Sequence, residues 1–348
     1  MQWKRLVFTA LALVLVVVLI QPAFASTAGN DGQGNQTAQP VQPAPSDLPA
    51  SSAGNQGVAE EQIQMKKVER NALVLQSDFG LKDGAVSAMK GVAFGVDREL
   101  AMFDLTHEIP AYDIWEGAYR LMQTASYWPA GTVFVSVVDP GVGTERSSIV
   151  LKTKTGHYFV GPDNGSFGLV AESMGVEAVR QIDETKNRLE GSEESYTFHG
   201  RDVYAYTGAR LASGQISFEE VGPLLEAKVT AIPYQKAELK NGVFKGNIPI
   251  LDIQYGNVWT NIDKKLFDQW KPQYGDQFLV KIYHEKALIY EGTIPYQYSF
   301  GGVEEGEPLL YFNSLMNLSL AINMDNFAAV HQVGSGAEWS IEITKIKK

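Results

Sequence analysis

The stretch Asn71–Gly80, with the sequence NALVLQSDFG, is the most informative one for the fold class. Its apolar run, Ala72 to Leu75, is bounded by polar residues and has the length of a buried strand. Downstream, from Gly84 to Gly95, apolar residues recur at helical spacing. A buried strand followed directly by a helix is typical of a βαβ unit, so we expect a mostly parallel sheet.

The same alternation continues along the chain before its pattern changes. Residues Asp113–Ser126 again have helical spacing, and Thr132–Val138 is a second clear strand. We therefore predict an α/β domain with a central, mostly parallel sheet over residues 67–225. Beyond it, short β-rich runs separated by Gly, Pro and Asn predict a small C-terminal β-barrel over residues 226–348, or else a sandwich. These runs are Val243-Phe244, Ile248–Ile253, Phe278–Ile282 and Trp339–Ile346.

The N-terminal segment has the composition of an export signal. Residues 1–25 combine Lys4 and Arg5, the apolar run Leu6–Ile20 and the small-residue motif Ala23-Phe24-Ala25. The run is shorter than the roughly 20 residues that a spanning helix needs, so we expect cleavage, export to a secreted or cell-envelope location, and no remaining membrane span. Residues 26–66 are rich in Gly, Gln, Pro, Ser and Ala, which predicts a disordered linker.

Composition excludes several classes of function. The chain has 348 residues and a formal net charge of -11, which disfavours a nucleic-acid partner. It has no cysteine, so disulfides and thiolate metal sites are excluded. The sequence also lacks an HExxH motif, a P-loop and a Gly-x-Ser-x-Gly elbow. We therefore expect neither a catalytic metal nor serine-hydrolase or phosphoryl-transfer chemistry.

Two loops that follow predicted strands carry charged residues. Asp78 comes directly after the first strand, where a carboxylate can take two ribose hydroxyls, although helix-capping acids are also common there. The loop Val138–Arg146 contains two glycines that permit close backbone approach to a ligand. Asp139 and Arg146 are positioned to pair across this loop, in a binding site or as an ordinary surface ion pair.

Two further motifs precede helical segments. In Phe198–Asp202, His199 is followed by a glycine and by neighbouring charges that can set its pKa or its tautomer. The turn Gly161–Gly165 contains Asn164 and is compatible with either a helix cap or a binding loop. Each motif alone is also compatible with a purely structural role.

The order of the motifs resembles the S-adenosylmethionine hydroxide adenosyltransferases and the related fluorinases and chlorinases. The similarity spans about residues 71 to 346. It implies an N-terminal α/β domain, a C-terminal β-barrel and a homotrimer, with the site between one subunit's first domain and a neighbour's second. The motifs that carry it are Ser77–Gly80, Asp104–Pro110, Val137–Thr144, Pro162–Gly165, Phe198–Asp202, Gly256–Asn261 and Asn313-Ser314.

The resemblance also implies roles for individual residues. S-adenosylmethionine is the implied substrate, water the nucleophile, adenosine and L-methionine the products, and no cofactor is expected. Leu315 and Ala85 depart from the pattern, since the halogenases have an arginine and a serine there. The implied substrate contacts are Asp78 to the ribose, Tyr112 to the nucleoside, Tyr255 and Asn257 to adenine, Asp252 and Ser314 to the methionine end, and Asn164 in the Pro-Asp-Asn-Gly motif.

Asp139, Arg146 and His199 match the set that the hydrolases of this family carry. A sulfonium is already a good neutral leaving group, so such a site needs only to place and activate water. We expect Asp139 and His199 to orient the water, with the proton acceptor left open between them and Arg146 fixing the carboxylate. Two alternatives stay open: a halogenase, disfavoured because the Asp139 carboxylate repels a halide, and an exported adenosyl-compound binding protein without turnover.

Overall fold

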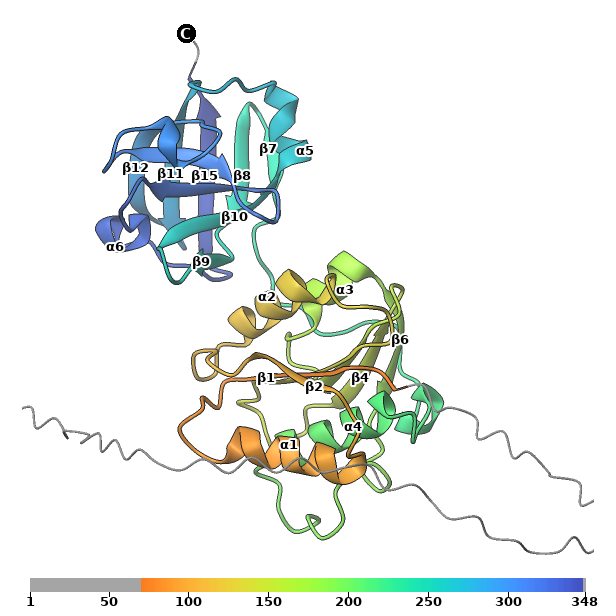
Figure 1. The fold of residues 1–348 in the computed structure, drawn as a ribbon. Helices are drawn as coiled ribbons and strands as arrows, with labels where there is room; N and C mark the ends of the chain where they lie inside the picture. The colour runs from red at the N-terminus through yellow and green to blue at the C-terminus, as the bar shows by residue number, and fades with distance from the viewer. Residues whose placement is uncertain (1–69, 347–348) are drawn as a thin grey trace, which may run out of the picture. The chain divides into compact units, whose positions relative to one another are not determined.

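The computed structural model describes residues 70–346 (Figure 1). The predicted signal segment and linker, residues 1–66, lie outside the described residues. No helix within residues 70–346 is long and apolar enough to cross a membrane. The first elements are β1 (Leu73–Ser77), α1 (Ala85–Val96), β2 (Met102–Thr106), α2 (Ile114–Ala125), β3 (Val133–Val137), β4 (Ser148–Thr153), β5 (Tyr158–Pro162), α3 (Gly168–Met174), β6 (Val176–Gln181), η1 (Gly200–Ala205), α4 (Tyr206–Ala212) and η2 (Phe218–Val221).

These elements form a six-stranded sheet covered by helices on both faces (Figure 1). The strand order is β2-β1-β3-β5-β4-β6, and β1 pairs in parallel with both β2 and β3. Leu73 and Leu75 pack in the cluster that includes α1 and α4, whereas Val74 packs in the cluster that includes α2 and α3. The predicted α/β fold, its two clearest strands and its two crossover helices are confirmed. The sheet is mixed, because β4 runs antiparallel to β5 and β6.

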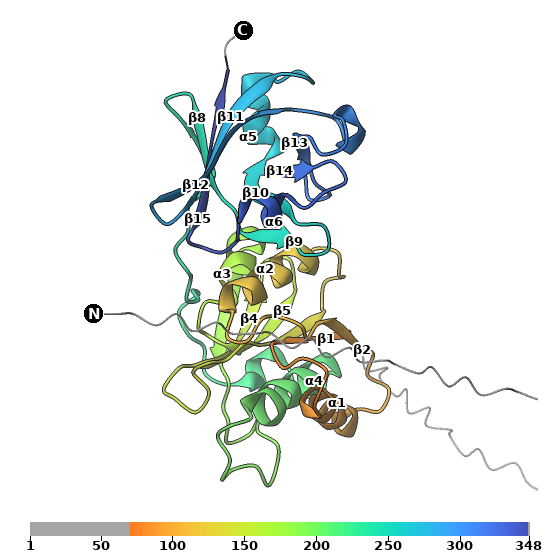
Figure 2. The same cartoon turned by 90° about the vertical axis from the view of Figure 1, so that its left-hand side faces the viewer.

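The second half of the chain forms two antiparallel sheets (Figure 2). One has the order β13-β14-β10-β9, and the other has the order β12-β11-β15-β8-β7. The elements are β7 (Glu238–Lys240), β8 (Val243–Asn247), β9 (Ile250–Asp252), β10 (Asn257–Asp263), α5 (Lys264–Phe267), η3 (Asp268–Trp270), β11 (Gln277–His284), β12 (Ala287–Pro295), η4 (Phe300–Gly302), β13 (Pro308–Phe312), β14 (Asn317–Ile322), α6 (Phe327–His331) and β15 (Trp339–Lys345).

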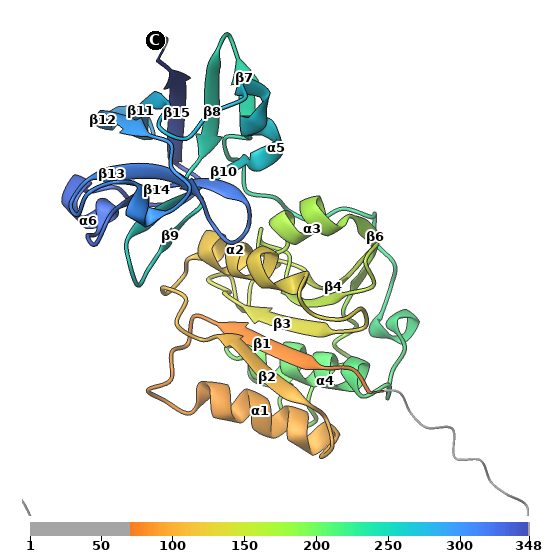
Figure 3. The same cartoon turned by 45° about the horizontal axis from the view of Figure 1, so that its top comes forward.

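The predicted β-barrel is not confirmed, since neither of these described sheets closes on itself. The two sheets, which Figure 3 shows from another side, instead share one apolar core. Phe244 and Phe278 come from one sheet, and Val258 and Leu320 come from the other. Apolar burial between two sheets satisfies the same alternating pattern that a barrel interior would. The described segment between η2 and β7 contains no helix or strand, and the domain boundary predicted at residue 225 stays a prediction within it.

Candidate active site

Asp78 lies where the sheet positions a ligand-binding carboxylate. It follows β1 directly, and its backbone N–H donates to the carbonyl of Val137 on β3 at 3.4 Å. Its Oδ2 accepts a hydrogen bond from the backbone N–H of Tyr112 at 2.8 Å. Tyr112 has a φ of 70°, and its side chain is 73% exposed. Asp78 and Tyr112 line a cavity of about 230 Å³ together with Asp139 and His199, beyond the carboxyl ends of parallel strands.

A series of hydrogen bonds, buried at Ser77 and His107, supports the backbone on either side of Asp78. Ser77 Oγ lies 2.7 Å from His107 Nδ1, and His107 Nε2 lies 3.1 Å from Asp104 Oδ1. Because a carboxylate only accepts, His107 Nε2 carries the proton and Nδ1 accepts from the Ser77 hydroxyl. The backbone N–H of Phe79 in turn donates to Ser77 Oγ at 3.3 Å.

The hydrogen bonds from Ser77 to His107 to Asp104 connect the same residue types as a Ser-His-Asp catalytic triad, but the serine is not accessible to a substrate. Ser77 is 0% exposed, so no substrate carbonyl can reach its hydroxyl. Burial lowers the pKa of His107, while Asp104 opposes that effect. We therefore assign His107 a positioning role for the Asp78 loop. Sequence reasoning quoted His107 within a motif but assigned it no function, because its bond to Ser77 spans 30 residues.

The structure brings Asp139, Arg146 and His199 together, as the sequence predicts. Arg146 Nε donates to Asp139 Oδ1 at 2.8 Å, and Arg146 Nη2 bonds to Asp139 Oδ2. The same Nη2 lies 3.0 Å from His199 Nδ1. Tyr204 OH donates to Asp139 Oδ2 at 3.3 Å, so Asp139 receives bonds from two neighbours. The Asp139 side chain is only 5% exposed, so this is no ordinary surface ion pair.

The contact from Arg146 determines the tautomer of His199. A guanidinium has only donors, so His199 Nδ1 must be the unprotonated acceptor. Neutral His199 therefore carries its hydrogen on Nε2, which is buried and has no hydrogen-bond partner among residues 70–346. Burial lowers the pKa of His199; Glu184 raises it, and the charge of Arg146 lowers it. The ring is thus held as a neutral donor at the cavity.

Local backbone structure places His199 beside the end of β3. The helical segment associated with the motif Phe198–Asp202 begins within that motif, as the π-helix η1, immediately after His199. A Cβ atom on Gly200 would lie 3.0 Å from Val137 Cγ1 and 3.3 Å from Phe79 Cζ. The glycine therefore permits the close approach that brings His199 to the loops after β1 and β3.

The remaining predicted substrate contacts divide between a second cavity and a structural loop. Asp252, Tyr255, Asn257 and Ser314 line one cavity of about 810 Å³. Asn257 Nδ2 donates to Asp252 Oδ2 at 3.3 Å, which joins the ends of β9 and β10. Sequence reasoning did not assign contacts to other residues that line this cavity, including Gln254, Trp259, Phe300, Tyr311, Asn313 and Met324.

Asn164 lines neither of these two cavities. Its Nδ2 donates to the carbonyl of Val138 at 2.9 Å, and its Oδ1 accepts from Ser166 Oγ at 2.7 Å. The side chain thus ties the loop after β5 to the end of β3. Its predicted contact with substrate stays a prediction.

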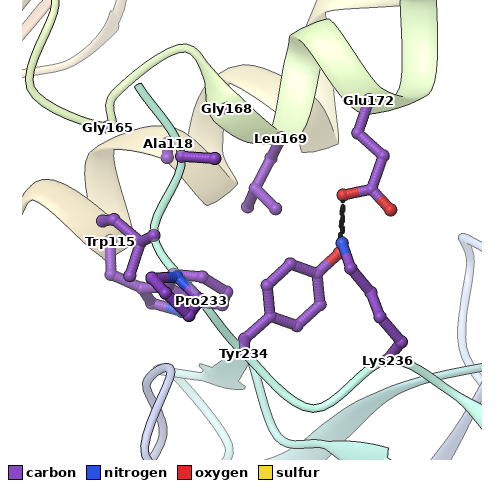
Figure 4. Close-up of a pocket in the computed structure, with 11 residues that line it drawn as sticks. Trp115, Ala118, Gly165, Gly168, Leu169, Glu172, Pro233, Tyr234 and Lys236 are labelled. Carbon is purple, nitrogen blue, oxygen red and sulfur yellow. Dashed lines mark hydrogen bonds and ion pairs between the residues drawn. The ribbon is translucent and has the colours of Figure 1, made fainter. Parts of the chain in front are cut away.

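A further cavity, of about 250 Å³, contains none of the predicted site residues (Figure 4). Tyr234 OH donates to Glu172 Oε2 at 3.0 Å, and Lys236 pairs with the same carboxylate. Lys236 Nζ also lies 3.7 Å from the centre of the Tyr234 ring. These groups bind one another, so we assign them to holding residues 231–236 against α3. Within residues 70–346, no group of three His, Asp or Glu residues is placed to hold a metal ion.

Comparison with known proteins agrees with this fold and these motifs. The chain matches the family models for the SAM hydroxide adenosyltransferase N-terminal domain over residues 73–222 and C-terminal domain over residues 246–340. An (R)-S-adenosyl-L-methionine hydrolase from Methanocaldococcus jannaschii is 36% identical over 231 residues, which are 65% of this chain and 79% of that protein. A fluorinase from an Actinoplanes species is 26% identical over 297 residues, which are 78% of this chain and 97% of that protein.

Solved structures extend the match to three dimensions. The crystal structure of an uncharacterized conserved protein from Thermotoga maritima matches this chain with a TM-score of 0.71 and 33% sequence identity. The match covers 78% of this chain and 100% of that chain. The fold therefore defines a protein with an N-terminal α/β domain and a C-terminal domain of antiparallel sheets. The chain belongs to the SAM hydroxide adenosyltransferase family, which confirms the resemblance found in the sequence.

Proposed function

We propose that this chain hydrolyses S-adenosyl-L-methionine to adenosine and L-methionine. The observation that carries the proposal is the single guanidinium, Arg146, that binds both Asp139 and His199 at the cavity containing Asp78. A binding protein has no need for such a water-activating set. The hydrolase name of relatives between 31% and 39% identical supports the same reaction.

The tautomer of His199 assigns the roles in water activation. His199 Nε2–H donates to the oxygen of the attacking water and orients it. Asp139 accepts a hydrogen of the same water and then its proton, because the only lone pair of the His199 ring is already bound by Arg146. A new bond forms between the water oxygen and C5′ of the ribose. The C5′–S bond breaks with its electron pair on sulfur, which leaves neutral methionine thioether.

Substrate binding uses both cavities. Asp78 keeps one carboxylate oxygen for the ribose hydroxyls, since Tyr112 N–H occupies the other, and the exposed Tyr112 ring packs against the nucleoside. Tyr255 and Asn257 contact adenine, and Asp252 and Ser314 contact the methionine end. Asn164 holds the loop after β5 in place, and we propose that this loop lies beside the ribose.

We further propose a homotrimer that completes the site. Asp139 and His199, which we predict to act on the water, are found in one cavity. The residues predicted to hold adenine and methionine are found in another. A neighbouring subunit that places its second cavity over the first would join the two sets. The sequence of residues 1–25 supports export of the protein, with cleavage before Ser26.

Chromatography of the purified protein incubated with S-adenosylmethionine tests the function. We expect adenosine and methionine in equal amounts, at a rate that does not depend on chloride. A chlorinated nucleoside would reassign the chain to the halogenases. Intact but bound substrate would instead establish a binding protein without turnover.

A further inference from the structure

The turn between β13 and β14, two strands labelled in Figure 3, covers residues 313–316. It contains a buried side-chain amide that forms only part of its hydrogen bonds within the described residues. Asn313 is only 6% exposed and lines the cavity of about 810 Å³. Its Oδ1 accepts hydrogen bonds from the backbone N–H groups of Leu315 at 2.9 Å and Asn317 at 3.1 Å. These two bonds fix the amide orientation, since only the oxygen can accept.

The other polar atom of the same amide is therefore the nitrogen, Nδ2, and it has no hydrogen-bond partner within the described residues. Asn313 Nδ2 is buried and forms no hydrogen bond within residues 70–346. A buried donor without an acceptor destabilises the folded protein, and such groups are rare in native structures. In a residue that lines a cavity, this pattern indicates an acceptor supplied by the ligand.

The charges around the cavity narrow the choice of acceptor. Asp252 and Asp325 line it, whereas none of its described lining residues is a lysine or an arginine. The amino-acid end of the proposed substrate carries one ammonium and one carboxylate. The two aspartates suit the ammonium, so the carboxylate has only neutral donors to bind.

Asn313 and its chain neighbour Ser314 are two such donors at consecutive positions on the wall of the cavity. Two adjacent neutral donors suit the two oxygens of a carboxylate. A ring nitrogen of adenine is a single acceptor, so it would satisfy only one of these two donors.

We propose that Asn313 is a specificity residue whose Nδ2 amide donates to the carboxylate of the methionine end, without help from a lysine or arginine in this cavity. This inference rests on the proposed hydrolysis of S-adenosylmethionine. It names the group that recognises the carboxylate, and it predicts that recognition depends on hydrogen bonding rather than on an ion pair.

The variant Asn313→Asp isolates the donor. Aspartate keeps an oxygen for the N–H groups of Leu315 and Asn317, and it replaces Nδ2 with a charged acceptor. Asn326→Asp is the matched control, because Asn326 lines the same cavity and its Oδ1 caps α6 through Ala329 N–H at 2.7 Å. Aspartate caps a helix equally well, so the control adds the same charge without removing the Asn313 donor.

Each protein is assayed with S-adenosylmethionine and with the same sulfonium lacking the carboxylate, decarboxylated S-adenosylmethionine. For Asn313→Asp we expect KM for S-adenosylmethionine to rise at least about tenfold with kcat nearly unchanged. With the decarboxylated substrate, KM should stay the same or fall, because the new charge attracts the ammonium. Asn326→Asp carries only the electrostatic effect of the added charge, so its ratio of KM values for the two substrates should change much less than that of Asn313→Asp.

A second variant and a binding measurement keep the inference testable. Ser314→Ala, at an exposed position, should weaken binding of the carboxylate-bearing substrate more than that of the decarboxylated one. In an Asp139→Asn background, which blocks the proposed turnover, dissociation constants from tryptophan fluorescence give the same comparison, because Trp259 lines this cavity. Equal effects of Asn313→Asp on both ligands would overturn the inference, as would no effect on either. Absence of turnover by the unmodified protein would instead refute the proposed hydrolysis.

Discussion

The two cavities differ in how far the chain satisfies its own polar groups. At the ends of β1 and β3, Asp139 is bound by Arg146 and Tyr204, and Arg146 also binds His199. In the larger cavity beside β13 and β14, Asn313 Nδ2 has no partner within residues 70–346. In our proposal the first arrangement is preorganised for chemistry, whereas the second is completed by the ligand. The comparison predicts that changes to Asp139, Arg146 and His199 affect kcat, whereas changes to the substrate contacts, at the Asp78 loop or in the larger cavity, affect KM.

Asp139→Asn tests the chemical side of this comparison most strongly. The amide cannot accept the proton of water and loses the charge that holds Arg146, so kcat should fall by about 1,000-fold or more. Dissociation of S-adenosylmethionine should change little. Single-turnover assays and equilibrium binding measure the two quantities. The control is Asp268→Asn, which removes the charge of an exposed carboxylate that pairs with Lys264. If Asp139→Asn kept turnover close to that of the unmodified protein, the assignment of Asp139 as the proton acceptor would be refuted.

His107→Leu tests the buried support of the first cavity. The Ser77 hydroxyl loses its acceptor, so we expect a loss of about 1–3 kcal/mol in the free energy of unfolding. The Asp78 loop should also move, which raises KM more than it lowers kcat. Lys90→Met removes only the partly exposed Lys90–Asp104 pair and should cost at most about 1 kcal/mol. Denaturant melts and steady-state kinetics give both readouts, and equal stability of the two variants would contradict the role assigned to His107.

Tyr255→Ala tests the recognition side of the comparison. Tyr255 is an exposed ring that lines the larger cavity, so its removal should raise KM about tenfold through lost stacking on adenine. The water-activating set is untouched, and kcat should stay within about threefold of the original value. Steady-state kinetics decide the matter. Tyr127→Ala, at an equally exposed ring that lines neither site cavity, is the control; a fall in kcat with no change in KM would reverse the division between the cavities.

The smallest expected effect concerns pH. Burial lowers the pKa of His199 below 6.5, so the neutral ring persists below that pH. As pH falls through this lowered pKa, protonation of Nδ1 breaks the bond from Arg146, and kcat should decline. Glu184 raises the pKa of His199, so Glu184→Gln should move the acid limb of the profile to lower pH. A shift of the limb to higher pH would contradict this account of the His199 environment.

Local sequence was enough to predict the elements around Asp78. The apolar run and the helical spacing that follows it are visible within one βαβ unit, and β1, α1, α2 and β3 confirm them. The antiparallel pair β4 and β5 was not singled out. Both strands are largely buried, so they lack the alternation that marks a half-exposed strand.

The motifs were also sufficient to group Asp139, Arg146 and His199 as one set, because their order along the chain matches the family. The pairing of Arg146 with Asp139 was also predicted, but the contact between Arg146 and His199 was not, since these two residues are 53 residues apart. The sequence left the proton acceptor open between Asp139 and His199, and the contact between Arg146 and His199 supports our proposal that it is Asp139.

The sequence by itself determined the α/β class, the family and the residue types of the candidate site, because these depend on local periodicity and on short motifs in order. Only the tertiary structure decided that the C-terminal sheets stay open, that His107 supports the Asp78 loop, and that Asn313, a residue lining a cavity, has a buried donor without a partner within residues 70–346. Each of these depends on which distant groups meet, and hydrogen-bond pairing between strands or side chains is settled by the packed chain rather than by its neighbours in sequence.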